Sequence, residues 1–117
     1  MPYSTAAKNS MLDHLGTEAV FASLHTADPG DTGASEVTGG TPAYVRKAIT
    51  WNAAASGAMD DSNAPVFDVP AGTHVNYVGL WSAESGGTWY GSDVVTEEVF
   101  AAQGTYTLTD MDLDLNT

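Results

Sequence analysis

The first apolar residues of the chain fall four positions apart, at Ala7, Met11 and Leu15. This spacing places them on one face of a helix. Ser4 is a suitable N-cap and Gly16 a suitable stop, so the pattern predicts a helix over about residues 5–15. Its apolar face can pack across a sheet, and Met11 offers an alternative role in docking another protein.

Beyond the helix, apolar and polar residues alternate in short runs typical of β-strands. The expected strands cover about residues 20–26, 44–51, 66–69, 75–81, 105–109 and 111–115. Between residues 75–81 and the last two of these strands, a tight hairpin at residues 84–87 leads into Trp89 and Tyr90, and residues 94–100 follow as an edge segment with a bend. Residues 75–81 are apolar on both faces, which predicts a central buried strand. The apolar parity reverses after Leu108, so a bulge or a corner between two sheets is expected near Thr109 and Asp110.

These patterns predict a mainly β fold: an antiparallel β-sandwich of about seven or eight short strands with one N-terminal helix. The chain has 117 residues, of which 43% are hydrophobic, and it is expected to form one domain over residues 1–117. Residues 27–43, here called the arm, form a long loop rich in glycine and proline. Long loops in small domains often carry function, so the arm is predicted to contact a partner.

The charge balance argues against nucleic-acid binding. The chain has three Lys and Arg residues and fifteen Asp and Glu residues, which gives a formal net charge of −12. A surface of this sign repels a phosphate backbone. The same acidity suits a basic protein partner, solubility or a salty environment, and the sequence does not distinguish these readings.

Neither a membrane nor disulfide chemistry is expected. No apolar run is long enough to cross a bilayer, and the first residues do not resemble a secretory leader. Cysteine is absent, which removes disulfides and thiolate metal sites.

No residue pattern predicts catalysis or a cofactor. The three histidines lie far apart, at His14, His25 and His74, without zinc-ligand spacing. No Gly-x-Ser-x-Gly motif marks a nucleophile. The chain is therefore predicted not to be an enzyme.

Three aspartates near the end of the chain resemble the spacing of a calcium loop, at Asp110, Asp112 and Asp114. However, Leu115 stands where such a loop needs glycine, and no glutamate closes it. The aspartates are predicted to lie on the solvated face of a strand, without a metal, where Arg46 or Lys47 can pair with them.

Six sequence segments, together with the capped helix, carry a resemblance to a known family. They read SLHTADPG, EVTGGTPAY, RKAITWN, SNAPVFDVPAGT, YVGLWSA and AQGTYTLT. They resemble short proteins of tailed phages, mostly of actinobacterial hosts, which are labelled tail-fibre-like or minor tail proteins. The resemblance extends from Ser4 to Thr109.

This resemblance implies a non-enzymatic structural protein on the outer surface of a virion, assembled in the host cytoplasm. Its partners would be other capsid or tail proteins. Two placements are open: a tail-fibre-like or minor tail protein, or a capsid decoration (cement) protein. The alternative is a carbohydrate-binding module for host adsorption, in which exposed Trp89 and Tyr90 stack on sugars.

The residues predicted to contact partners belong to the arm, a basic pair and the helix. They are Asp28, Pro29, Gly30, Glu36, Val37, Arg46, Lys47 and Met11. Copies of the chain are expected to form a homo-oligomer or to bind as repeated units on a lattice, where many small interfaces act together.

Overall fold

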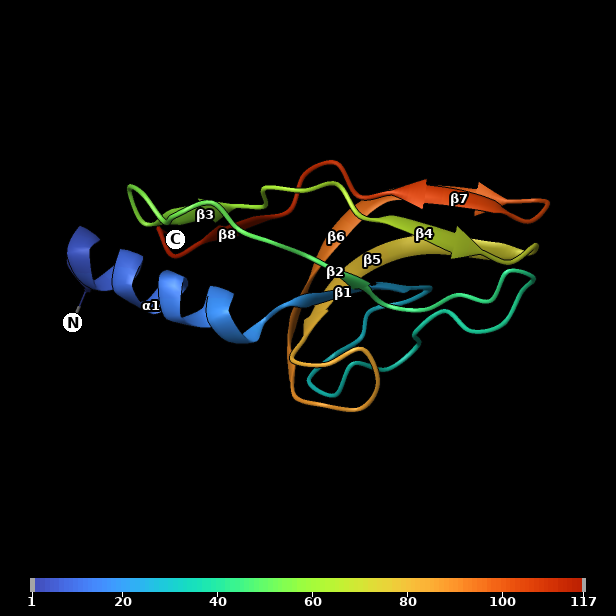
Figure 1. The fold of residues 1–117 in the computed structure, drawn as a ribbon, viewed down its shortest axis with the longest axis horizontal. Helices are drawn as coiled ribbons and strands as arrows, with labels where there is room; N and C mark the ends of the chain where they lie inside the picture. The colour runs from blue at the N-terminus through green and yellow to red at the C-terminus, as the bar shows by residue number, and fades with distance from the viewer. Residues whose placement is uncertain (1, 117) are drawn as a thin grey trace.

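A four-stranded antiparallel sheet forms the centre of the molecule, as the computed structural model of residues 2–116 shows (Figure 1). Its strand order is β2 (Lys47–Ala48), β1 (Phe21–His25), β5 (Thr73–Trp81) and β6 (Trp89–Phe100). β5 lies between β1 and β6, as expected for a strand that is apolar on both faces.

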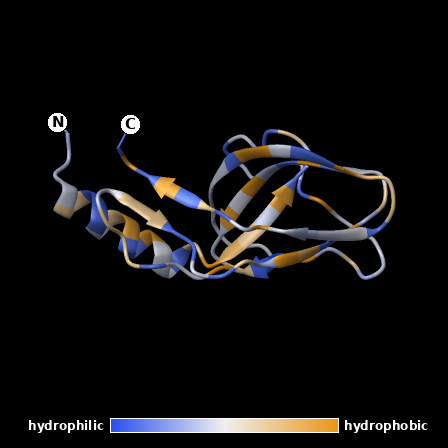
Figure 2. Ribbon diagram, turned by 90° about the horizontal axis from the view of Figure 1, so that it is seen from above, coloured by the Kyte–Doolittle hydropathy of each residue, from blue (hydrophilic) through white to orange (hydrophobic). Residues whose placement is uncertain are grey.

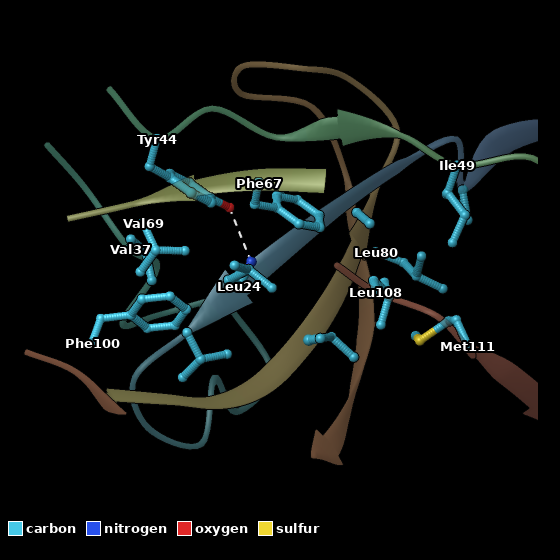
Figure 3. Packing of buried hydrophobic residues seen from close by; sticks show 14 residues of the cluster. Leu24, Val37, Tyr44, Ile49, Phe67, Val69, Leu80, Phe100, Leu108 and Met111 are labelled. Atoms are coloured by element: carbon cyan, nitrogen blue, oxygen red, sulfur yellow. Dashed lines mark hydrogen bonds between the residues drawn. The ribbon is translucent and has the colours of Figure 1, made fainter. Parts of the chain in front are cut away.

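A second layer covers one face of this sheet. β4 (Val66–Val69) pairs with β7 (Gly104–Thr107), and the ribbon packs its apolar side chains against the main sheet (Figures 1 and 3). Phe67 is fully buried between the layers and stacks on Tyr44, with ring centres 6.2 Å apart. Leu24 and Leu80 of the sheet belong to the same core.

A helix and a third ribbon form the other end of the molecule. Helix α1 (Thr5–Glu18) lies beside β3 (Ala58–Asp60), which pairs with β8 (Asp112–Asp114) (Figures 1 and 2). Leu12 and Met59 are buried here, apart from the main cluster. Backbone N–H groups of the loop before β3 donate to helix side chains: Ala54 to Asp13 at 2.8 Å and Gly57 to Asn9 at 2.9 Å.

The mainly β prediction is confirmed: the described residues form eight antiparallel strands and one helix, and their sheets do not close into a barrel. The dimensions are 46 × 24 × 22 Å. None of the described helical structure has the length and apolar character that crossing a membrane requires.

The sequence prediction missed β3, and two predicted elements have different bounds in the structure. The helix continues past Gly16 to Glu18, because the missing side chain of Gly16 leaves room for Met59 and Trp51. The strand expected over residues 44–51 is reduced to Lys47–Ala48. Tyr44 and Ile49 are buried, but Val45 is 42% exposed, and Tyr44 meets β1 through its side-chain hydroxyl rather than through a backbone ladder.

The reversal of apolar parity after Leu108 marks a change of sheet. Tyr106 pairs with Phe67 of β4, whereas Leu113 pairs with Met59 of β3. The chain therefore leaves one ribbon and enters another between β7 and β8, which confirms the expected corner near Thr109 and Asp110.

Candidate functional site

The arm lies along the edge of β1 that β2 leaves open. β2 pairs only with the first two residues of β1. Further along, Val37 N–H donates to the carbonyl of Leu24 at 3.0 Å. Leu24 N–H donates to the hydroxyl of Tyr44, also at 3.0 Å (Figure 3). The arm and the adjoining Tyr44 thus satisfy backbone groups of a strand edge, which are costly to bury without partners.

Arg46 joins the arm to the hairpin between β5 and β6. Its guanidinium donates to both carboxylate oxygens of Glu36 at 3.0–3.3 Å. It also donates to the carbonyls of Ala83 and Gly86 at 3.0 and 2.8 Å. Its central carbon lies 3.7 Å from the centre of the Trp81 ring, so a forked ion pair and a cation–π contact share one side chain.

Glu36 is the shared acceptor of this arrangement. Besides the bonds from Arg46, it accepts a hydrogen bond from the Tyr44 hydroxyl at 2.8 Å. Burial raises the pKa of Tyr44 above its ordinary value, which keeps the phenol protonated as a donor. Only 9% of the Arg46 side chain and 20% of the Glu36 side chain are exposed.

Ser23 and His25 form a second polar group on the outer face of the main sheet. His25 Nδ1 lies 2.8 Å from the carbonyl of Ala34, which can only accept, so Nδ1 carries a proton. Ser23 Oγ lies 2.7 Å from Nε2 and accepts a bond from Trp81 Nε1 at 3.0 Å. Burial lowers the pKa of His25, which favours the neutral ring with Nε2 accepting from the serine hydroxyl.

This serine–histidine pair was missed by the sequence reasoning. The signal was their spacing of two residues, which puts both side chains on one face of β1. Both residues are completely buried, so a substrate has no path to the hydroxyl. The pair holds the arm through Ala34 and orients Trp81.

Trp89 covers the same pair from β6. Its ring meets His25 edge-on at 5.3 Å and Trp81 at 5.0 Å, and its Nε1 donates to the carbonyl of Gly30 at 3.2 Å. Trp89 is half-buried by these contacts. Gly79 of β5 leaves room for its ring, because a Cβ there would lie 2.5 Å from Trp89.

Three carboxylates gather where β3 and β8 meet. Asp60, Asp110 and Asp112 offer oxygens that all lie within 4.8 Å of one another, and all three residues are exposed. A hydrogen bond with Asp60 and repulsion from Asp110 raise the pKa of Asp112 to about 6. Exposed carboxylates of this kind do not by themselves indicate a metal site, since Ca²⁺ takes six to eight oxygens.

The expected pairing of these aspartates with Arg46 is wrong, because Arg46 binds Glu36 instead. The sequence grouped Asp110, Asp112 and Asp114. The structure instead gathers Asp60 with Asp110 and Asp112.

A groove of about 400 Å³ separates β6 from β8. It is lined by the apolar residues Leu15 and Leu80, together with residues 90–93 and 111–114. Both Asp112 and Asp114 of β8 line it as well. It is the place where the helical end of the molecule meets the main sheet.

A comparison with known protein families identifies the family of this chain. A family model described as "Podophage GP4 fiber I protein gp80" matches residues 2–115. The chain belongs to this family. No curated protein and no solved structure gives a significant match.

As a member of the gp80 fibre family, the chain is a tail-fibre-like structural protein of a phage virion. The phage resemblance is confirmed at this level. Membership also associates the chain with other virion components.

The predicted contact residues divide into exposed and buried sets. Asp28 and Gly30 are exposed near the start of the arm, and Met11 is 38% exposed on α1. In contrast, Pro29 and Val37, which also belong to the arm, are buried.

The charged contact residues are also not equivalent. Glu36 and Arg46 neutralise each other, whereas Lys47 is half-buried on β2. A partner contact through the Arg46 charge would therefore require breaking the internal ion pair, and Lys47 keeps its predicted role alone. Tyr90, like Trp89, is half-buried, and it packs against the main core.

Proposed function

We propose that this gp80-family protein is a component of the tail fibres of a tailed phage, placed on the outside of the virion and acting through protein–protein contacts without catalysis. The observation that carries the proposal is the family match over residues 2–115, which spans the helix, the arm and all eight strands. A fibre family favours the tail over the capsid surface. The actinobacterial host and the homo-oligomer remain predictions.

The internal use of the reactive side chains supports a role in contacts. Ser23 and His25 are buried, and Arg46 is bound to Glu36. Catalysis requires groups that a substrate can reach. Here the polar residues hold the arm against the sheet and leave backbone edges and exposed carboxylates at the surface.

The half-buried aromatic residues weigh against the alternative of carbohydrate binding. A sugar-binding platform presents aromatic faces to solvent, but Trp89 lies against His25 and Trp81. Tyr90 packs toward the core. A protein partner therefore explains the surface better than a glycan.

Counting the protein in purified virions tests the placement. Quantitative mass spectrometry against the major capsid protein is expected to give a few to a few tens of copies per particle. Hundreds of copies would point to decoration of the capsid lattice and overturn the tail placement. Absence from the particle would overturn the virion role altogether.

A further inference from the structure

The groove between β6 and β8 lies between two strand edges, neither of which pairs with a further strand of the described residues. Among the described residues, β6 is the last strand of the main sheet and β8 pairs only with β3. The walls are the runs 90–93 and 111–114. Each run offers a short length of strand backbone, and edges of this kind pair readily with an added extended chain.

The groove has an apolar floor and an acidic rim. Leu80 and Met111 are 2% and 3% exposed, and the half-buried Leu113 lies beside them. Asp93 from one wall and Asp112 from the other are exposed. Long basic side chains match such a site, because their aliphatic stems cover apolar surface while their charged ends remain at the rim.

This chain cannot supply the matching charge itself. Its three basic residues are Lys8, Arg46 and Lys47. The Lys8 ammonium donates to Asn116 at 2.9 Å, Arg46 is bound to Glu36, and Lys47 lies on β2, at the opposite edge of the main sheet from β6. A second copy would bring a further net charge of −12 to an acidic groove, so like charges oppose self-docking.

We propose that the groove between β6 and β8 binds an extended, lysine- or arginine-bearing segment of another virion protein. This inference rests on the proposed function and names its partner surface. The segment adds its backbone to one or both strand edges and places its basic side chains beside Asp93, Asp112 and Asp114. Backbone pairing supplies affinity, and the acidic rim selects a basic sequence.

Removing the rim charges tests the proposal. The triple variant Asp93→Asn, Asp112→Asn, Asp114→Asn keeps the shape of each side chain, including the Oδ1 of Asp114 that accepts from Asn116 N–H at 2.7 Å. Its copy number per virion is expected to fall at least tenfold. A matched control removes three exposed carboxylates elsewhere, Asp31→Asn, Glu84→Gln and Glu98→Gln, and should keep wild-type occupancy. Equal occupancy of the two triple variants overturns the proposal.

Photo-crosslinking in assembled virions gives a second measurement that does not depend on the stability of the triple variant. The photoreactive residue p-benzoylphenylalanine replaces Ser92 in the groove, and in a control it replaces the exposed Ser85 of the β5–β6 hairpin. The expected adduct forms from position 92, not from position 85, and joins a segment containing Lys or Arg in another virion protein.

The outcomes separate the two proposals. An adduct with a second copy of this chain, with a segment lacking basic residues, or no adduct from virions that contain the protein overturns the groove assignment alone. Absence of the wild-type protein from virions overturns the proposed function, and the groove assignment with it.

Discussion

The guanidinium of Arg46 lies 3.7 Å from the centre of the Trp81 ring. Arg46 comes directly before β2 and Trp81 ends β5, so the contact links two segments that are far apart in the sequence and lie on either side of β1. Glu36 of the arm completes the arrangement through its ion pair with Arg46. The arm is therefore held by specific polar contacts, although its glycine-rich sequence suggests a free loop.

Arg46→Lys should lower the free energy of unfolding by about 2–3 kcal/mol, because lysine keeps the charge but loses the forked geometry and the planar stack. Chemical denaturation measures this change. Lys47→Arg, an exchange of the same two residue types at the neighbouring position, should remain within about 0.5 kcal/mol of wild type. Equal effects at the two positions would contradict the role assigned to Arg46.

Ser23→Ala should destabilise the protein by about 1–3 kcal/mol, since it leaves Nε2 of His25 and Nε1 of Trp81 buried without their common partner. Ser92→Ala on exposed β6 serves as the control. Long-range proton–nitrogen NMR spectra of the wild type should show His25 protonated at Nδ1. Protonation at Nε2 instead would refute the proposed hydrogen-bond direction.

Gly33→Ala should destabilise more than Gly39→Ala. Both glycines have positive φ, +76° and +88°, so each substitution carries a similar backbone strain of about 1 kcal/mol. An added Cβ at Gly33 would also collide with the Trp81 ring, whereas none of the surrounding atoms lies within 4 Å at Gly39. The free energy of unfolding should fall by about 1–3 kcal/mol more in Gly33→Ala than in Gly39→Ala, as measured by thermal or chemical unfolding.

Equal losses of unfolding free energy in the two variants would show that the rings of Trp81 and Trp89 move aside easily. In that case the packing of the arm on Trp81 and Trp89 contributes little to the fold. A change in tryptophan emission in Gly33→Ala, absent in Gly39→Ala, would locate the disturbance at these rings.

The strands that were predicted well are those whose side-chain pattern follows from burial alone. Val75 to Trp81 reads as a central strand because both its faces are covered, and the parity reversal after Leu108 follows from pairing with two different ribbons. In both cases the alternation of apolar residues follows from which faces of the strand are buried, so the strand could be predicted from the sequence.

The prediction failed where long-range side-chain contacts replace backbone pairing. Residues near Tyr44 alternate as a strand would, but Tyr44 reaches Leu24 N–H through its hydroxyl. The role of Arg46 could not be predicted from its sequence neighbours either, because its partners Glu36, Trp81 and Gly86 are not adjacent to it in the sequence. Asp60 joins Asp112 only through the pairing of β3 with β8.

The pH dependence of stability should combine two opposite contributions. His25 has a folded-state pKa below its ordinary value of 6.5. As the pH falls below 6.5, the unfolded chain binds a proton that the folded chain does not, and the free energy of unfolding decreases. Asp112 acts in the other direction: its pKa is about 6 in the fold and 3.8 ordinarily, so between these values the folded chain binds the extra proton and gains stability on acidification.

Asp112→Asn separates the two contributions. At pH 7 it should raise the free energy of unfolding, by no more than about 0.5 kcal/mol because solvent screens charges as exposed as these. Between pH 6 and 4, the variant should lose stability more steeply than the wild type, since the opposing gain from Asp112 is gone and the loss from His25 remains. Denaturation curves across this range measure the difference, and carboxyl NMR should place the Asp112 midpoint near 6. Parallel pH profiles for the two proteins would show that Asp60 and Asp110 do not hold the proton on Asp112 in solution.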